Sequence, residues 1–337
     1  MRTLVISDLH LGARLRHDVL RRPEPLGRLL AALGDVQRLV LLGDSVELME
    51  GRAEQAMKIA EPVMRAIGAR LGSGREVIIV PGNHDAPLVR TWKRGQAGEL
   101  KLETAIGSDA TPALARLASW LAPARVRVHY PGVWLSERVW ATHGHYLDRH
   151  LLPDSSVGIA RGLLGRLPRD GAMPIDYERS SRPSFSPVSR WLPLPLAALL
   201  DDLAKLARAS TMPRVRRRLL HRRIAPLTAM LLGAQMRRAS IPALARVVHR
   251  LGVDAEWVLF GHVHRSGPLP VEDPLQWQGP GGRPKIANTG SWCYEPLLLH
   301  RATPPHPYWP GGAVLLEPGQ DPRAIGLLDD LDVAALR

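Results

Sequence analysis

Five short motifs of this chain contain the residue types that bind metal ions and transfer protons. They are Asp8-Leu9-His10, Gly43-Asp44, Gly82-Asn83-His84-Asp85, Thr142-His143-Gly144 and Gly261-His262-Val263-His264. Carboxylate, carboxamide and imidazole groups suit divalent ions such as manganese, iron or zinc. The single cysteine excludes a site built from several thiolates. Seven candidate ligands are enough for two ions that share one carboxylate: Asp8, His10, Asp44, Asn83, His143, His262 and His264.

The spacing within the motifs favours ligands over structural residues. Asp8 and His10 are two residues apart, so on a strand they point to the same side. His262 and His264 repeat this spacing after Gly261. A turn would explain Gly82-Asn83 but not the His84-Asp85 that follows. The motifs therefore predict a metal centre, although each could be structural when taken alone.

Each motif lies at or just after a short apolar run that is typical of a β-strand. Because helical stretches separate the first few runs, the pattern predicts an α/β core. The expected helices cover Leu26–Leu33 and Ala53–Leu71. The expected strands cover Thr3–Ser7, Arg38–Leu42, Glu76–Val80, Arg125–Tyr130, Val139–Thr142, Glu256–Phe260, Lys285–Asn288 and Gly312–Leu316.

A long basic segment separates the fourth motif from the fifth. Residues 151–255 carry 18 Arg and Lys against 7 Asp and Glu, which is most of the chain's net charge of +13. Residues 146–190 are rich in loop-forming residues, whereas four helices are predicted between 196 and 251, the last being Ile241–Leu251 before Gly252. The charge points to an anionic partner, unless it is only a solvated helical face.

The composition fits a globular protein of a reducing compartment. Of its 337 residues, 45% are hydrophobic, and Cys293 has no cysteine to pair with. No uncharged stretch reaches the roughly 20 residues that span a bilayer. The first apolar run is too short for a signal peptide. We therefore expect a cytoplasmic protein that is at most peripheral to the inner face of a membrane.

In this order, the five motifs resemble those of the calcineurin-like metallophosphoesterase superfamily, with no substitution at a ligand position. The resemblance covers residues 1–145 and 252–330. It implies a four-layer α/β/β/α sandwich as the core. It also implies that residues 146–251, a loop-rich and then helical basic insertion, form a helical lid or cap.

The resemblance implies a role for each candidate residue. Asp8, His10 and His264 would bind one metal, Asn83, His143 and His262 would bind the other, and Asp44 would bridge them. The two divalent ions would be manganese, with iron, zinc or cobalt as alternatives, and would activate a hydroxide that attacks phosphorus. His84 would protonate the leaving oxygen, with Asp85 orienting its ring. His145 is a further candidate for binding substrate.

The second motif narrows the range of substrate classes that we expect. Gly43-Asp44-Ser45-Val46-Glu47 lacks the Asp-Arg-Gly of protein phosphatases and is more similar to UDP-2,3-diacylglucosamine pyrophosphatases, whose helical lid holds acyl chains. Those enzymes have arginine where this chain has His84. We therefore expect hydrolysis of a phosphomonoester, phosphodiester or pyrophosphate bond in an anionic lipid or a nucleotide-linked substrate.

Two other functions are open at this point. A metal-dependent nuclease could use the basic insertion to bind nucleic acid, although residues 196–255 contain no Trp, Tyr or Phe that could stack on bases. A non-catalytic interaction module could also have this fold, although a complete ligand set is not what such a module needs.

Overall fold

The structure is a computed structural model that describes residues 1–13, 17–50, 52–95, 100–150, 168–180, 239–296, 298–299 and 301–337. Contacts divide the chain into two compact units. The first contains Met1–His145, Val253–Glu295 and Thr303–Arg337, and the second contains Tyr146–Gly252 and Pro296–Ala302. None of the helices in the described segments combines the length and apolar character needed to cross a bilayer.

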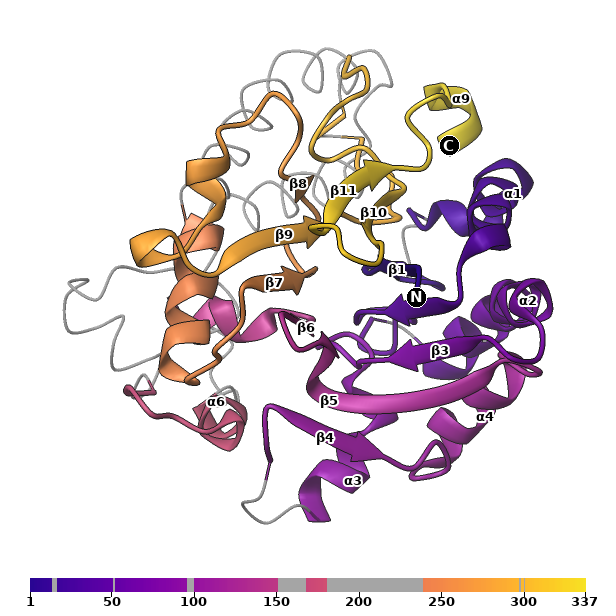
Figure 1. Cartoon of the computed structure of the whole chain (residues 1–337). Helices are drawn as coiled ribbons and strands as arrows, with labels where there is room; N and C mark the ends of the chain where they lie inside the picture. The colour runs from indigo at the N-terminus through magenta and orange to yellow at the C-terminus, as the bar shows by residue number, and fades with distance from the viewer. Residues whose placement is uncertain are drawn as a thin grey trace, which may run out of the picture. The chain divides into compact units, whose positions relative to one another are not determined.

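The first unit is built on a mixed sheet with helices beside it (Figure 1). Within the described residues, eleven strands join in the order β11-β10-β1-β2-β3-β5-β6-β7-β9-β8, and β4 pairs with β5. The strands are β1 (Thr3–Ile6), β2 (Arg38–Leu41), β3 (Glu76–Ile79), β4 (Glu103–Ile106), β5 (Arg125–Ser136), β6 (Val139–Thr142), β7 (Trp257–Phe260), β8 (Ser266–Gly267), β9 (Lys285–Thr289), β10 (Gly312–Leu316) and β11 (Arg323–Gly326).

The helices of the first unit connect and cover these strands. In Figure 1, α1 and α2 lie beside β1 and β3, and α4 lies beside β5. The α-helices are α1 (Pro23–Ala32), α2 (Ala53–Leu71), α3 (Arg90–Gly95), α4 (Pro112–Trp120) and α9 (Val333–Leu336). The 3-10 helices are η1 (Val19–Arg21), η2 (Leu33–Asp35), η3 (Ala86–Leu88), η6 (Pro274–Trp277) and η7 (Pro280–Gly282), and η4 (His145–His150) leads into the second unit.

Strand direction explains how the motifs can meet. β1, β2, β3 and β5 run parallel, β6, β7 and β9 run parallel, and β5 pairs with β6 in the antiparallel sense. One buried cluster contains Val5 and Val40 from the first set together with Ala141 and Leu259 from the second. The two halves of the sheet therefore share a hydrophobic core, which brings together the loops that follow their strands.

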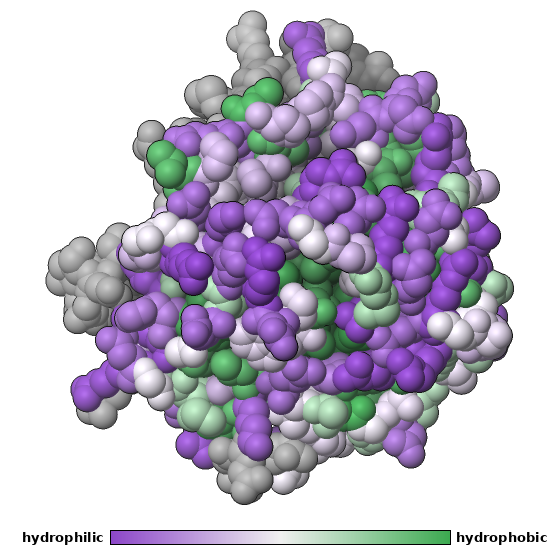
Figure 2. Space-filling view, in the orientation of Figure 1, coloured by the Kyte–Doolittle hydropathy of each residue, from purple (hydrophilic) through white to green (hydrophobic). Residues whose placement is uncertain are grey.

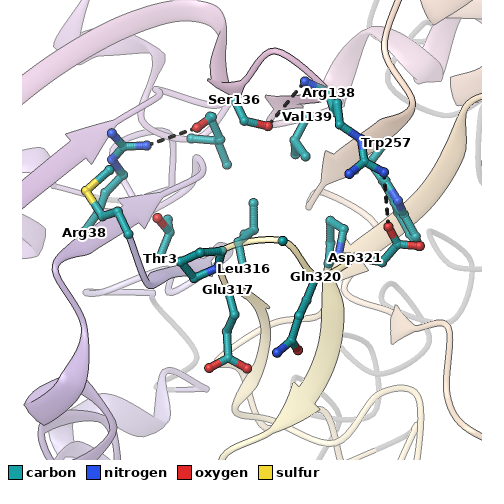
Figure 3. Close-up of a pocket in the computed structure, with 15 residues that line it drawn as sticks. Thr3, Arg38, Ser136, Arg138, Val139, Trp257, Leu316, Glu317, Gln320 and Asp321 are labelled. Atoms are coloured by element: carbon teal, nitrogen blue, oxygen red, sulfur yellow. Dashed lines mark hydrogen bonds and ion pairs between the residues drawn. The ribbon is translucent and has the colours of Figure 1, made fainter.

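A pocket of about 290 Å³ opens at the start of these strands (Figure 3). Its lining includes Thr3, Val139 and Trp257, which belong to the first residues of β1, β6 and β7, and charged residues such as Arg38 and Asp321. Figure 2 shows a largely hydrophilic face with hydrophobic residues visible in a central hollow. Because the five motifs follow the opposite ends of the strands, this pocket is separate from the candidate site.

The described part of the second unit is small. It contains α6 (Pro174–Ser180) and a helical stretch at 239–250, after which Gly252 takes a left-handed φ of 65°. The His150 ring contacts the Tyr177 hydroxyl at 2.9 Å, and Tyr177 stacks on Tyr146. The expected helices between 196 and 238 lie outside the described residues, so the helical lid stays a prediction.

Candidate metal centre

The candidate ligands from all five motifs lie together in the first unit. Among the described residues there are three groups of side chains whose ligand atoms, within each group, lie within 4.8 Å of one another, and each group shares a residue with the next. Asp8 and His10 follow β1, Asp44 follows β2, His143 follows β6, and His262 and His264 follow β7. The groups are Asp8, His10 and His264; His10, Asp44 and His84; and Asp44, His143 and His262.

The backbone at these ligands is held in an uncommon conformation. Among the described residues, six that are not glycine have a positive φ, and five of the six are predicted ligands. They are Asp8 (54°), His10 (43°), Asp44 (51°), His262 (68°) and His264 (55°). Side chains disfavour this left-handed region, so its concentration here indicates a functional constraint.

Neighbouring glycines allow the loops to approach one another closely. A Cβ atom on Gly43 would lie 2.2 Å from the His143 ring, and one on Gly82 would lie 2.3 Å from the Asp44 carboxylate. A Cβ atom on Gly261 would lie 2.5 Å from the Asp8 carboxylate. These three glycines of the motifs are therefore needed for packing at the centre.

At His143, hydrogen-bond acceptors converge on one point. His143 Nδ1 lies 3.0 Å from the Leu42 carbonyl, which can only accept, so Nδ1 carries a proton. In the neutral ring Nε2 then has a lone pair, and it faces Asn83 Oδ1 at 3.1 Å and Asp44 Oδ2 at 3.1 Å. Three acceptors around one point fit a cation.

The group at Asp8 fits a cation for a second reason. Asp8 is fully buried, and among the described residues its Oδ1 has no hydrogen-bond partner. This oxygen lies 3.3 Å from His264 Nε2 and 3.8 Å from His10 Nε2, and the two Nε2 atoms are 3.1 Å apart. The other oxygen, Oδ2, accepts from the Ser7 hydroxyl and from the His262 N–H. A metal ion would satisfy Oδ1.

The pKa values of the buried groups in the centre are set by the same contacts between carboxylates and imidazoles. Burial by itself would lower the pKa of His143, but the Asp44 carboxylate raises it to about 10. Burial would raise the pKa of Asp8, but the His264 ring lowers it to about 2. The carboxylates thus hold protons on the imidazoles when no metal is bound, and a divalent cation would replace those protons.

His84 and Asp85 have different surroundings from those expected. Asp85 is buried, and its carboxylate accepts backbone N–H groups of Gly82 at 2.6 Å and Ser45 at 2.8 Å. The His84 ring is contacted instead by Glu47, with Nδ1 and Oε2 2.6 Å apart. Asp85 therefore braces the loops rather than orienting the His84 ring.

Glu47 is the residue to which the sequence interpretation gave no role. Its Oε2 also lies 3.0 Å from His10 Nδ1, and its Oε1 accepts the N–H groups of Met49 and Glu50. Burial would raise the pKa of Glu47, but the hydrogen bonds from His10 and His84 lower it to about 2. The Gly-Asp-x-x-Glu spacing was the available signal.

His145 and the residues at and after the end of β9 lie around the candidate ligands. The His145 ring centroid is 5.7 Å from that of His143 and 6.5 Å from that of His262. Asn288 Nδ2 donates to the Gly261 carbonyl at 2.7 Å, and Trp292 N–H donates to the Asp8 carbonyl at 3.0 Å. Residues from β9 onward thus hold the first and fifth motifs in place.

Sequence comparison assigns part of the chain to a family. A family model described as calcineurin-like phosphoesterase matches residues 1–167, so a domain of this family covers that part of the chain. The match contains four of the motifs, and His262 and His264 lie beyond it. No curated protein matches the chain. Proteins of this family are generally metal-dependent hydrolases.

Proposed function

We propose that this protein, whose residues 1–167 form a calcineurin-like phosphoesterase domain, is a phosphoesterase that uses two divalent metal ions. The observation that carries the proposal is that three groups of His and Asp side chains lie next to one another. The first and second groups share His10, and the second and third share Asp44. Asp8, His10 and His264 would hold one ion, Asn83, His143 and His262 the other, with Asp44 between them. Manganese is the proposed metal, and iron, zinc and cobalt are the alternatives to test.

When bound, the ions would supply Lewis acidity and a water molecule of lowered pKa for attack on phosphorus. The chain's own residues do the rest. The Glu47 contact and the nearby Asp44 carboxylate outweigh burial and raise the pKa of His84 to about 9. His84 can therefore carry a proton at neutral pH and donate it to the leaving oxygen. Glu47 fixes the ring that does so.

We propose an anionic lipid or a nucleotide-linked phosphoester or pyrophosphate as the substrate, as in the UDP-2,3-diacylglucosamine pyrophosphatase-like interpretation. The support is the Gly-Asp-x-x-Glu motif and the basic composition of residues 151–255. Rates on UDP-diacylglucosamine, a lysophospholipid phosphate and bis-p-nitrophenyl phosphate would test this. Equal rates on all three, unchanged by deletion of residues 196–238, would overturn the lipid interpretation.

The phosphoesterase proposal itself is tested by Asp44→Asn. Asparagine tolerates the left-handed backbone of Asp44 but brings no charge. We expect manganese-dependent hydrolysis of p-nitrophenyl phosphate or bis-p-nitrophenyl phosphate by the wild type, abolished by a chelator, and a loss of roughly 100-fold or more in the variant. Asp35→Asn is the matched control, because Asp35 is 87% exposed. Wild-type protein that stays inactive with every metal would refute the proposal.

A further inference from the structure

A short antiparallel pairing places one more carboxylate beside the candidate metal centre. The N–H of Val19 donates to the Trp292 carbonyl at 3.0 Å, and the N–H of Tyr294 donates to the His17 carbonyl at 2.7 Å. The two segments follow the first motif and β9, and both belong to the first unit. The pairing therefore fixes His17 and Glu295, which lie at its end, relative to each other.

Glu295 faces the first motif. Cys293 Sγ lies 3.8 Å from the Asp8 carbonyl. Alternate residues of extended backbone point to one side, so Glu295, two residues after Cys293, is directed toward the same motif. Its Oε1 lies 3.2 Å from His17 Nδ1, and its side chain is 33% exposed. A neutral imidazole that donates from Nδ1 orients this carboxylate and leaves its negative charge in place.

The charge of Glu295 reaches two candidate ligands of the first ion. Burial would lower the pKa of His264, but the carboxylates of Asp8 and then Glu295 raise it. Burial would raise the pKa of Glu295, but His17 above all, and then His264 and His10, lower it. The effects are reciprocal, as expected for charges that lie close together. Glu295 therefore acts on the same group of ligands as Asp8.

The two proposed ions differ in the negative charge around them. The first would have Asp8 in addition to the shared Asp44, and Glu47 contacts its ligand His10. The second would have only the shared carboxylate, because the side chain of Asn83 is neutral. The first ion should therefore bind more tightly than the second, and a further carboxylate on its side should increase the difference.

We propose that Glu295, held by His17, is a positioning residue that raises the affinity of the protein for the first ion. Among the described residues, Glu295 is in none of the three ligand groups, so it acts through His264 and through its charge rather than as a ligand. This inference rests on the proposed function, because it takes Asp8, His10 and His264 as the ligands of that ion.

The test is a calorimetric titration of manganese into the metal-free whole chain at about pH 8, above the ordinary pKa of histidine. We expect two binding steps in the wild type, the tighter one being the first ion. Glu295→Gln should weaken the tighter step roughly tenfold and the weaker step much less. Glu295→Asp keeps the charge and should lose much less affinity, which a role in packing alone would not predict.

Glu61→Gln is the matched control. Glu61 is also paired, with Arg65 at 2.8 Å, and its side chain is 34% exposed, close to the value for Glu295. This variant should keep both steps, and thermal unfolding should show all variants folded.

The proposal is overturned if the wild type binds both ions equally tightly, or if Glu295→Gln leaves the tighter step unchanged or weakens both steps equally. An equal loss in Glu295→Asp or in Glu61→Gln would overturn it as well. These readouts do not need turnover. Wild-type protein that binds two ions but hydrolyses no ester would instead contradict the proposed function alone.

Discussion

Glu47 links two residues with different proposed roles. One of its oxygen atoms contacts both His10, a candidate ligand, and His84, the candidate proton donor. Its other oxygen is held by two backbone N–H groups, so the carboxylate cannot rotate freely. A change at Glu47 should therefore affect metal binding and proton donation together, as for other partners of metal-bound histidines.

Glu47→Gln should lower kcat by about 10- to 100-fold at saturating metal and weaken metal binding by a similar factor. The amide removes the charge that holds the proton on His84 and orients His10. In a His84→Ala background, the same change should lower kcat much less, because the residue it supports is absent.

Steady-state rates measured against manganese concentration check this prediction. Glu24→Gln is the control, since Glu24 is exposed in the first turn of α1 and its substitution removes the same charge outside the centre. Equal losses of kcat in the wild-type and His84→Ala backgrounds would show that Glu47 does not act through His84.

Residue type and spacing along the chain indicated the seven candidate ligands that the structure brings together, because short motifs and glycine turns are local properties. The expected strand geometry was wrong, since Asp8, His10, His262 and His264 follow β1 and β7 and have a positive φ instead.

The sequence could not assign partners to carboxylates. Asp85 is adjacent to His84 along the chain but accepts from Gly82 and Ser45, whereas Glu47 reaches His84 across 37 positions. Such contacts depend on how β2 and β3 pair, which the sequence does not state.

Among the elements, α2 lies close to the residue that ends α4, and a glycine stands at this contact. A Cβ atom on Gly68 would lie 2.5 Å from the Leu121 carbonyl oxygen, whereas nothing lies within 4 Å of one on Gly27 in α1. Gly68→Ala should therefore destabilise the protein by about 1–3 kcal/mol through overpacking. Gly27→Ala should stabilise it by about 0.5–1 kcal/mol, because alanine favours a helix. Denaturant unfolding of both variants checks the pair, and equal effects would contradict the packing argument.

The start of three parallel strands depends on one buried carboxylate. Glu76 in β3 is in register with Arg38 of β2 and Arg125 of β5, and it also contacts Arg127. Burial would raise the pKa of Glu76, but the arginines, Arg38 above all, lower it from its ordinary 4.5. A lowered pKa means that the stabilisation is complete above pH 4.5 and is lost as pH falls below that value.

Glu76→Gln should therefore lower the free energy of unfolding by about 1–3 kcal/mol at neutral pH, because partly buried Arg38 loses its charged partner. The difference from wild type should shrink as pH falls below the ordinary glutamate value. Denaturant unfolding at neutral and acidic pH measures it. A difference that grows at low pH would contradict the assigned sign.

The elements themselves were largely predictable. All eight expected strands are present, and α2 has the expected bounds. The missed strands are β4, β8 and β11, which are short or polar and lie at or near sheet edges. Continuous apolar runs identify strands that are buried on both faces. These three strands lack such runs and depend on pairing with a neighbour instead.

For the whole molecule, metal binding should raise the stability of the folded protein against thermal unfolding. An ion that binds only the folded chain stabilises it by about 2.7 kcal/mol at 100 times its dissociation constant. We expect manganese to raise the Tm of the wild type and a chelator to reverse this. Asp44→Asn should show a much smaller shift. A shift of equal size in that variant would place the binding elsewhere.

The arrangement of the whole chain was predictable only in part. The motifs indicated that residues before 145 and after 252 meet, and the first compact unit contains both sets. The four-layer sandwich and the lid remain predictions. No motif states how the basic segment at 151–255 folds, since charge and helical periodicity do not specify what a helix covers.

The left-handed backbone at five candidate ligands has a cost in free energy. Each such residue costs roughly 1–2 kcal/mol relative to an ordinary conformation. The fold carries that cost, because the loops hold Asp8, His10, Asp44, His262 and His264 in this conformation. The protein is thus less stable than it would be with ordinary backbone at these five residues. A metal ion that bound only this conformation would offset the cost.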